Sequence, residues 1–330
     1  MNIKESPDKF NPSRWVPGGH AQTLWRKFAA VTAVNHARER IELKDGDFID
    51  LDWNDQDNLQ RGNNGMIVLI LHGLCGCSKS SYVQSLQYKL GLLGIPSAAM
   101  NFRGCSGEVN RLAKAYHSGI TEDLCEVFES ISEQYSESRI ALAGFSLGAN
   151  VLLKWLGEAK LPDKVSKAVA VSTPFHLSNC SQAMLRGLSR YYGQYFLWRL
   201  VSVMEKKKAY FRKTENTEQL EILESFGNLR SLKSIWHFDE KVTAPLHGFA
   251  GAEDYYDKCS SMQFLTDIKT PTLLLQSNDD PIIPAHTLPQ IHDMSDAIHI
   301  DLSESGGHVG FASASDRFWL EHRIIQFLTA

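Results

Sequence analysis

The alternation of apolar and polar residues along the chain predicts strands and helices in regular succession. Residues 40–53 alternate around Asp45-Gly46-Asp47, which is typical of an antiparallel hairpin. Residues 66–71 form an unbroken apolar run, as expected for a strand buried on both faces of a mostly parallel sheet. Further strands are predicted at 97–102, 139–144 and 167–172, with helices near 80–93, 120–134 and 147–156. This order predicts right-handed crossovers and helices on both faces of the sheet.

The alternation stops after residue 173 and resumes at residue 267. The intervening 174–266 segment contains aromatic and charged helical stretches but no convincing strand, whereas strands are predicted again at 270–276 and 297–303, before a final helix at 316–328. We therefore predict an α/β protein with a mostly parallel central sheet, whose core comprises residues 1–173 and 267–330 and carries a helical cap insertion at 174–266. The lysines at 206–208 are expected on a solvated face of a cap helix, in preference to a phosphate or lipid site.

Charge and composition narrow the class of protein. With 34 Lys and Arg against 38 Asp and Glu, the formal charge of −4 argues against a protein devoted to nucleic acid. The polar N-terminus lacks the apolar region of a secretory signal, and no apolar run approaches the roughly 18 residues of a membrane span. The six cysteines fit neither a disulfide framework nor a zinc pattern. We expect a cytoplasmic protein with reduced thiols and no integral membrane segment.

The segment Gly144-Phe145-Ser146-Leu147-Gly148 matches G-x-S-x-G between a predicted strand and an amphipathic helix. In that context a serine sits on a sharp turn at a helix N-terminus, where the helix dipole favours developing negative charge. The alternative is a glycine- and serine-rich turn in which the serine only caps the helix. The strand–turn–helix order favours Ser146 as a nucleophile.

His72-Gly73, directly after the strand at 66–71, marks a second element of the candidate site. The backbone N–H groups of Leu74 and Leu147 would there face a developing oxyanion. His72 is expected to be structural rather than a base. The alternative is that His72-Gly73 only ends the strand.

A serine nucleophile requires a base, because its hydroxyl reacts poorly without one. His308 lies in the glycine-rich loop SGGHVGF, after a late strand and before the last helix. Asp279 and Asp280 follow the apolar run 273–275. One of these two, with Ser146 and His308, satisfies the chain order Ser…Asp…His. Adjacent side chains cannot both orient the same imidazole, so at most one of the aspartates is the triad acid.

Four motifs give the sequence a resemblance to a known family. They are PGGHAQTLW (17–25), HGLCG (72–76) with the Ser80-Ser81-Tyr82 that follows, NFRGCSGE (101–108) and YHSG (116–119). Together with G-x-S-x-G and the late G-G-H loop, they resemble the α/β-hydrolase superfamily and, more narrowly, its YheT-like subgroup. The resemblance implies a serine hydrolase acting on carboxylic esters, with some relatives that transfer acyl groups to alcohols and others that cleave phospholipid acyl chains. It also favours Asp280 as the acid, because the superfamily acid commonly lies four residues before a proline, as Asp280 does before Pro284. Asp279 is then left to the backbone of the turn or to solvent.

The sequence thus predicts a carboxylesterase that needs no cofactor and no metal, with a small-molecule ester or lipid-like substrate of short to medium acyl chain. The apolar cap residues Phe196, Leu197, Trp198 and Leu200 either hold the acyl chain or form the cap core. Two other classes compete: a non-catalytic binding protein of this fold, and metal-dependent hydrolysis through Asp279, Asp280 and nearby histidines, for which clustered ligand spacing is missing. The loop at 101–119 is expected to support the site, with Arg103 and Glu108 as a possible ion pair.

Overall fold

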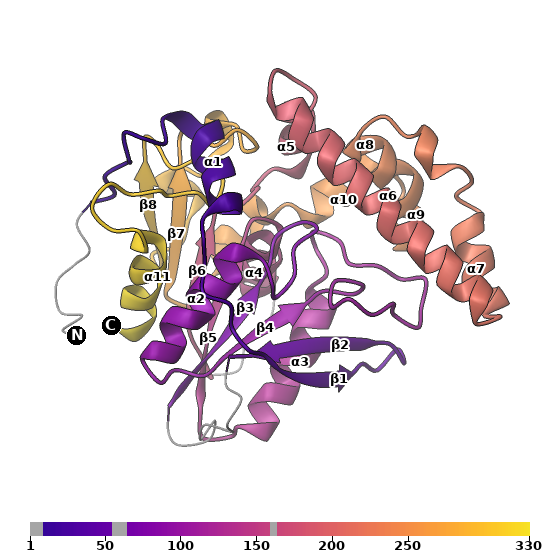
Figure 1. The fold of residues 1–330 in the computed structure, drawn as a ribbon, viewed down its shortest axis with the longest axis horizontal. Coiled ribbons are helices and arrows are strands. Elements are labelled where there is room, and N and C mark those ends of the chain that lie inside the picture. The colour runs from indigo at the N-terminus through magenta and orange to yellow at the C-terminus, as the bar shows by residue number, and fades with distance from the viewer. Residues whose placement is uncertain (1–8, 55–64, 159–163) are drawn as a thin grey trace.

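The computed structural model describes residues 9–54, 65–158 and 164–330 of the chain. Its centre is one eight-stranded sheet of order β1-β2-β4-β3-β5-β6-β7-β8 (Figure 1). The strands are β1 (Ala37–Glu42), β2 (Phe48–Trp53), β3 (Met66–Leu71), β4 (Ser97–Asn101), β5 (Arg139–Phe145), β6 (Val165–Val171), β7 (Thr272–Ser277) and β8 (Ile298–Ser303). The six strands in the order β4-β3-β5-β6-β7-β8 are parallel, whereas β2 pairs antiparallel with both β1 and β4. The predicted α/β class is confirmed.

Helices cover both faces of the sheet, because the side chains of its central strands point alternately to each face. On one face, Leu69 and Leu142 pack with α3 (Thr121–Gln134) and α4 (Leu147–Glu158). On the other, Val68 and Ala143 pack with α2 (Ser81–Leu92) and α11 (Trp319–Thr329). β3 and β5 lie between these layers and are almost completely buried apart from the exposed Arg139 at the start of β5, which agrees with their apolar sequences.

Between β6 and β7 the described chain forms helices but no strand, and these helices lie beyond one end of the sheet (Figure 1). The α-helices are α5 (Leu177–Ala183), α6 (Ser189–Lys213), α7 (Thr217–Glu224), α8 (Ile235–Phe238), α9 (Ala244–Leu246) and α10 (Ala252–Cys259). A π-helical turn at Asp239–Thr243 joins α8 to α9. The segment has an apolar cluster of its own, around Leu197, Phe211 and Leu223. Its treatment as a separate cap domain with limits at 174 and 266 stays a prediction.

The expectation of a solvated lysine face at 206–208 was wrong for two of the three residues. Lys207 is buried and donates to the carbonyl oxygens of Ala113 (3.2 Å) and Lys114 (2.6 Å), and its burial lowers its pKa to about 8. Lys208 is also buried and donates to the carbonyl of Gly227. These two ammonium groups therefore bind neighbouring loops, whereas Lys206 remains exposed. No helix in the described part of the chain has both the length and the apolarity needed to span a membrane.

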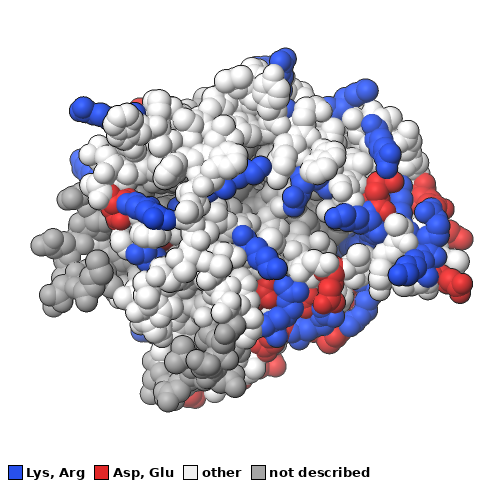
Figure 2. Space-filling view, viewed as in Figure 1, with Lys and Arg blue, Asp and Glu red and all other residues white. Residues whose placement is uncertain are grey.

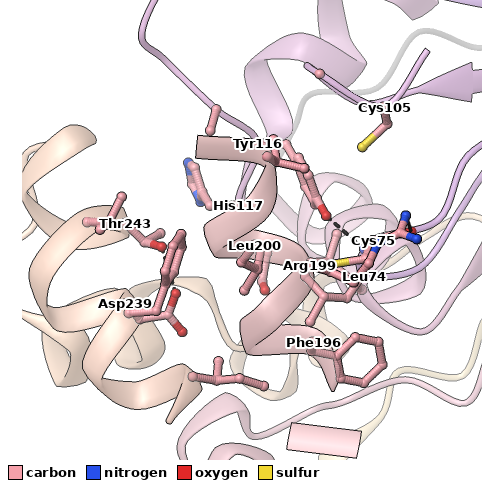
Figure 3. Close-up of a pocket in the computed structure, with 18 of the residues that line it drawn as sticks. Leu74, Cys75, Cys105, Tyr116, His117, Phe196, Arg199, Leu200, Asp239 and Thr243 are labelled. Atoms are coloured by element: carbon pink, nitrogen blue, oxygen red, sulfur yellow. Dashed lines mark hydrogen bonds between the residues drawn. The ribbon is translucent and has the colours of Figure 1, made fainter. Parts of the chain in front are cut away.

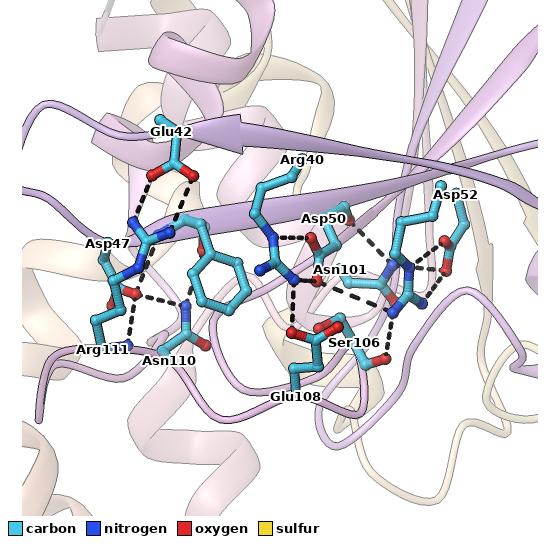
Figure 4. Close-up of polar contacts among 12 residues, drawn as sticks. Arg40, Glu42, Asp47, Asp50, Asp52, Asn101, Ser106, Glu108, Asn110 and Arg111 are labelled. Atoms are coloured by element: carbon cyan, nitrogen blue, oxygen red, sulfur yellow. Dashed lines mark hydrogen bonds and ion pairs between the residues drawn. The ribbon is translucent and has the colours of Figure 1, made fainter. Parts of the chain in front are cut away.

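Ion pairs on the β1–β2 hairpin bind the loop that follows β4 (Figure 4). Arg40 bridges Asp50 (2.7 Å) and Glu108 (2.8 Å), and Asn110 donates to Asp47 (2.9 Å). Glu108 is thus paired with the hairpin, so the suggested pairing of Arg103 with Glu108 was wrong.

Arg103 is instead the buried cation of this loop. Its guanidinium makes two 2.7 Å bonds to Asp123 on α3 and reaches Asp47 (3.0 Å) and Asp45 (2.9 Å). The side chains of Arg103, Asp47 and Asp123 are each 1% exposed or less. The buried charges are therefore matched, and the loop is tied to α3 and the hairpin at once.

We predict that Arg103→Met lowers the free energy of unfolding by about 3–5 kcal/mol, because it leaves the buried carboxylates without their cation. Urea denaturation measures the loss. Arg111→Met is the matched control: the Arg111–Glu42 pair joins the same loop to the same hairpin but is exposed, so its loss should be much smaller. Equal losses for the two variants would contradict the assignment.

Candidate active site

Ser146 occupies the turn between β5 and α4 with a backbone φ of +52°, a strained conformation for a residue that is not glycine. The two glycines of the motif allow this turn. A Cβ on Gly148 would lie 2.6 Å from the carbonyl oxygens of Leu71 and His72, and one on Gly144 would lie 2.7 Å from the Gly148 carbonyl oxygen. The turn therefore packs directly against the end of β3, which the pentapeptide alone did not reveal.

The structure brings Ser146, His308 and Asp280 into one hydrogen-bonded chain. Ser146 Oγ lies 2.8 Å from His308 Nε2, and His308 Nδ1 lies 2.8 Å from Asp280 Oδ2. In the tautomer that carries the proton on Nδ1, His308 donates to Asp280 and accepts from the serine hydroxyl. The Asp280 side chain is fully buried and that of His308 is 10% exposed. The three side chains come from loops at the carboxyl ends of β5, β7 and β8.

The paired aspartates point to different groups. Asp280 Oδ1 accepts the backbone N–H groups of Ile282 (2.8 Å) and Ile283 (3.1 Å), which leaves Oδ2 for His308. Asp279 Oδ1 accepts the N–H of Gly307 at 2.8 Å, in the loop that carries His308. Asp279 thus fastens the histidine loop rather than facing solvent. The two carboxylates do not converge, and no group of three or more metal-binding side chains gathers in the described residues.

The helix α1 (Gly18–Phe28) holds the histidine loop from its other side, a role the sequence analysis missed. Thr23 Oγ1 accepts the backbone N–H of His308 at 2.8 Å. A Cβ on Gly19 would lie 1.7 Å from the Asp279 carbonyl oxygen, and one on Gly307 would lie 2.4 Å from the Gly19 carbonyl oxygen. The PGGHAQTLW motif was the available signal: it is the segment that packs here.

The predicted oxyanion donors, the N–H groups of Leu74 and Leu147, belong to residues that line one cavity with Ser146. Leu147 is the first residue of α4, whose first-turn N–H groups have no partner within the helix. Neither N–H has an acceptor among the described residues. Both neighbours of Leu74 are bonded, since Gly73 N–H donates to Tyr82 Oη (2.9 Å) and Cys75 N–H donates to Tyr116 Oη (2.8 Å). Two tyrosines therefore fix the loop while leaving one N–H between them free to bind a ligand.

His72 is buried, and both of its ring nitrogens are engaged. Nδ1 donates to the Gly73 carbonyl oxygen (2.8 Å), and Nε2 accepts the N–H of Phe102 (3.2 Å). Burial lowers its pKa to about 4, so the ring stays neutral near neutral pH. His72 therefore links the ends of β3 and β4 and has no nitrogen left to act as a base.

A cavity of about 340 Å³ begins at Ser146 and extends beneath α6. The residues drawn around it include Leu74, Cys75 and Tyr116 at one end, and His117, Asp239 and Thr243 at the other (Figure 3). Between these ends the wall is largely apolar. A cavity of this size falls within the range typical of small-molecule sites.

The four apolar cap residues, which the sequence assigned either to an acyl-chain site or to the cap core, lie in three different environments. Phe196 and Leu200 line the cavity, Leu197 is buried in the cap cluster, and the Trp198 side chain is 64% exposed. Successive residues of one helix point in different directions, so a single role for the run was not possible.

The far end of the cavity is polar, which the sequence did not predict. Asp239 Oδ1 and Oδ2 accept the hydroxyl groups of Thr243 and Tyr256, each at 2.7 Å, and burial raises the pKa of Asp239 to about 6. Nearby, His247 Nε2 is buried without a partner among the described residues, and burial lowers the pKa of His247 to about 4. The ring of His247 lies 4.4 Å from that of His117. These groups can hydrogen-bond a polar end of a ligand.

The sequence model of the alpha/beta hydrolase fold matches residues 67–307. This chain belongs to the α/β-hydrolase family. It is 36% identical over 335 residues to YheT of Escherichia coli (strain K12), a protein named as a proposed esterase. The match covers 99% of this chain and 95% of that protein. The chain is therefore a YheT-like α/β-hydrolase, as the sequence motifs predicted.

Other proteins are similar at greater distance. Human phospholipase ABHD3 is 29% identical over 310 residues, covering 92% of this chain and 74% of that protein. Monoacylglycerol lipase of Saccharomyces cerevisiae is 28% identical over 280 residues, covering 83% and 61%. Among solved structures, an esterase of Pyrococcus furiosus superposes with a TM-score of 0.55 at 18% identity, covering 98% of this chain and 97% of that one. That likeness supports the α/β-hydrolase fold alone.

We predict that Asp239→Asn becomes more stable relative to the unsubstituted protein as pH rises. Because the folded state raises the pKa of Asp239 to about 6, the unsubstituted protein loses stability as this carboxyl ionises between about pH 4 and pH 6, by about 3 kcal/mol. Asparagine does not ionise. Chemical denaturation across this pH range measures the difference; a difference independent of pH would contradict the assignment.

Proposed function

We propose that this hydrolase cleaves carboxylic esters through an acyl-enzyme on Ser146. Ser146 Oγ attacks the ester carbonyl while His308 Nε2 takes its proton, forming a tetrahedral intermediate. When that intermediate collapses, His308 returns the proton to the leaving alkoxide and the acyl group stays on Ser146. A water molecule then attacks the acyl-enzyme while His308 takes its proton, and His308 returns that proton to Ser146 Oγ as the carboxylic acid leaves.

The observation that carries the proposal is the chain of two 2.8 Å contacts from Ser146 through His308 to Asp280. A hydroxyl needs a base within hydrogen-bond reach, and the base needs a partner that fixes its tautomer. The buried Asp280 carboxylate supplies that partner and stabilises the imidazolium when it forms. Its own position is fixed by two backbone N–H groups.

The unpaired N–H groups of Leu74 and Leu147 support the same reaction. Both belong to residues that line the cavity with Ser146, and an oxyanion formed there would accept both. A single donor of this kind typically contributes about 10²–10³ in turnover. Because Tyr82 and Tyr116 hold the backbone on either side of Leu74, the Leu74 donor need not reorganise during the reaction.

The substrate we propose is a small ester with a short to medium acyl chain, and the cavity supports this choice. Its apolar wall beneath α6 suits an acyl chain, and its volume of about 340 Å³ limits the length that fits. The names of the relatives, a phospholipase and a monoacylglycerol lipase, agree with an ester of lipid type. We place the reaction in the cytoplasm, in keeping with six cysteines that are all free thiols.

A fluorophosphonate probe tests the nucleophile. The intact protein should be labelled, and Ser146→Ala should abolish the label. Ser181→Ala is the matched control, since Ser181 lines the same cavity without a histidine partner, and it should leave labelling intact. An unlabelled intact protein would contradict the serine-hydrolase proposal and favour a non-catalytic binding protein; labelling that survives Ser146→Ala would exclude Ser146.

We predict that Asp280→Asn lowers kcat by about 10⁴, because the amide reverses the tautomer that His308 needs. Asp279→Asn should lower kcat less than about tenfold, since the asparagine oxygen can still accept the Gly307 N–H. Steady-state hydrolysis of p-nitrophenyl butyrate measures both. A larger loss in Asp279→Asn than in Asp280→Asn would reassign the acid.

Val203→Phe tests the cavity as the acyl site. Val203 lines the cavity on α6, so the larger ring should shorten the space available to an acyl chain. We expect kcat/KM for p-nitrophenyl octanoate to fall about tenfold or more, because pockets discriminate by about that factor per methylene. The value for p-nitrophenyl acetate should change little. A parallel loss on both esters would show that the chain lies elsewhere.

A further inference from the structure

Exposed apolar side chains are concentrated in two stretches of the chain. Of the fifteen large hydrophobic side chains exposed in the described residues, nine lie within 15–28 and 185–198. They are Trp15, Leu24, Trp25, Phe28, Leu185, Leu188, Tyr191, Tyr195 and Trp198. Single exposed apolar residues are ordinary on protein surfaces, but a concentration of this kind marks an interaction surface.

The helix α6 presents two different faces. One face is a row of exposed apolar residues, three or four positions apart, around the start of the helix. The row consists of Leu188 (61% exposed), Tyr191 (61%), Tyr195 (37%) and Trp198 (64%). Phe196, Leu200 and Val203 lie on another side and line the cavity. The exposed row and the cavity-lining residues therefore lie on different sides of one helix.

The helix α1 lies against the start of α6 and extends this surface. His20 Nδ1 is 3.1 Å from the Tyr192 hydroxyl, with the two rings stacked, and Lys27 Nζ lies 4.3 Å from the centre of the Tyr195 ring. Leu24, Trp25 and Phe28 form the exposed side of α1, and Phe28 is 77% exposed. We call these three α1 residues and the exposed row on α6 the docking face; it comprises Leu24, Trp25, Phe28, Leu188, Tyr191, Tyr195 and Trp198.

The charges around the docking face are positive. The sequence from Lys9 to Arg38 contains no Asp or Glu, and neither does the sequence from Lys164 to Met204. Arg14, Lys27, Arg186 and Arg190 are all exposed in these stretches. In Figure 2, acidic side chains lie mainly in the lower half and at the right-hand end of the molecule. Basic side chains surround the hollow in the centre of this view. This polarity is complementary to a negatively charged surface.

We propose that the docking face binds the surface of an anionic phospholipid bilayer. Tyrosine and tryptophan side chains are stable at the level of lipid headgroups, where the ring is buried and the polar atom stays hydrated. Lysines and arginines beside them are attracted to anionic headgroups, by roughly fivefold in affinity for each cation near the surface. The binding goes beyond the proposed function, because it requires neither Ser146 nor ester cleavage. It would set the cavity wall on α6 next to lipid.

Vesicle co-sedimentation of the Ser146→Ala protein tests the proposal without turnover. The protein should bind vesicles of phosphatidylcholine and phosphatidylglycerol mixed two to one, and bind vesicles of phosphatidylcholine alone much less. Added salt should weaken the binding. Tyr191→Ala/Trp198→Ala in the same background should lower the affinity about tenfold, because two partly inserted rings are lost. Tyr210→Ala is the matched control, an exposed tyrosine near the other end of α6, and should bind normally.

Three results would overturn the docking proposal. They are an absence of binding to the anionic vesicles, equal binding by the double variant and the Tyr210→Ala control, and a dimer in light scattering that the double variant dissociates. The last result would assign the face to contact between two copies of the chain. Tyr191→Ala/Trp198→Ala on the active protein should keep hydrolysis of p-nitrophenyl acetate within about twofold, since neither residue lines the cavity. Vesicle binding and ester cleavage can thus fail separately.

Discussion

The positive φ of Ser146 is the constraint on which the rest of the site depends. A non-glycine residue in this conformation is strained by about 1–3 kcal/mol and persists only where its surroundings fix it. Here the turn is held by the close packing of Gly148 on the end of β3 and of Gly144 on the start of α4. The same turn starts α4, so the serine hydroxyl and an unpaired helix N–H are directed by one piece of backbone.

The other parts of the site are brought to this turn by structure that is remote in sequence. His308 is held by Asp279 from the β7 loop and by Thr23 from α1, so its loop is fastened on two sides. The loop that carries Leu74 is held by Tyr82 and Tyr116. The loop after β4 is in turn fixed by Arg103 to α3 and to the hairpin. These contacts surround a cavity of about 340 Å³ that Ser146 lines.

Local patterns predicted the sheet well, because strands buried on both faces need continuous apolar runs: β3 occupies the predicted 66–71 without change. Proximity in the site was harder. Ser146 and His308 were proposed from their glycine-rich loops, whereas the preference for Asp280 required a family resemblance; the structure places the three side chains in one hydrogen-bonded chain. The sequence did not show that Asp279 binds Gly307, that α1 contacts the histidine loop, or that Lys207 is buried, since each depends on a partner distant in sequence. The helices between β6 and β7 were predicted from the absence of a strand pattern, but periodicity alone did not reveal which side of α6 faces the cavity.

We propose that Ser146 and His308 act as one catalytic unit, which a double-mutant cycle on ester hydrolysis tests. Residues of one catalytic unit show strongly non-additive losses, because removing either partner already disables the mechanism. We expect Ser146→Ala, His308→Ala and the double variant to have the same residual kcat within about threefold. Losses that multiply in the double variant would show that Ser146 and His308 act independently.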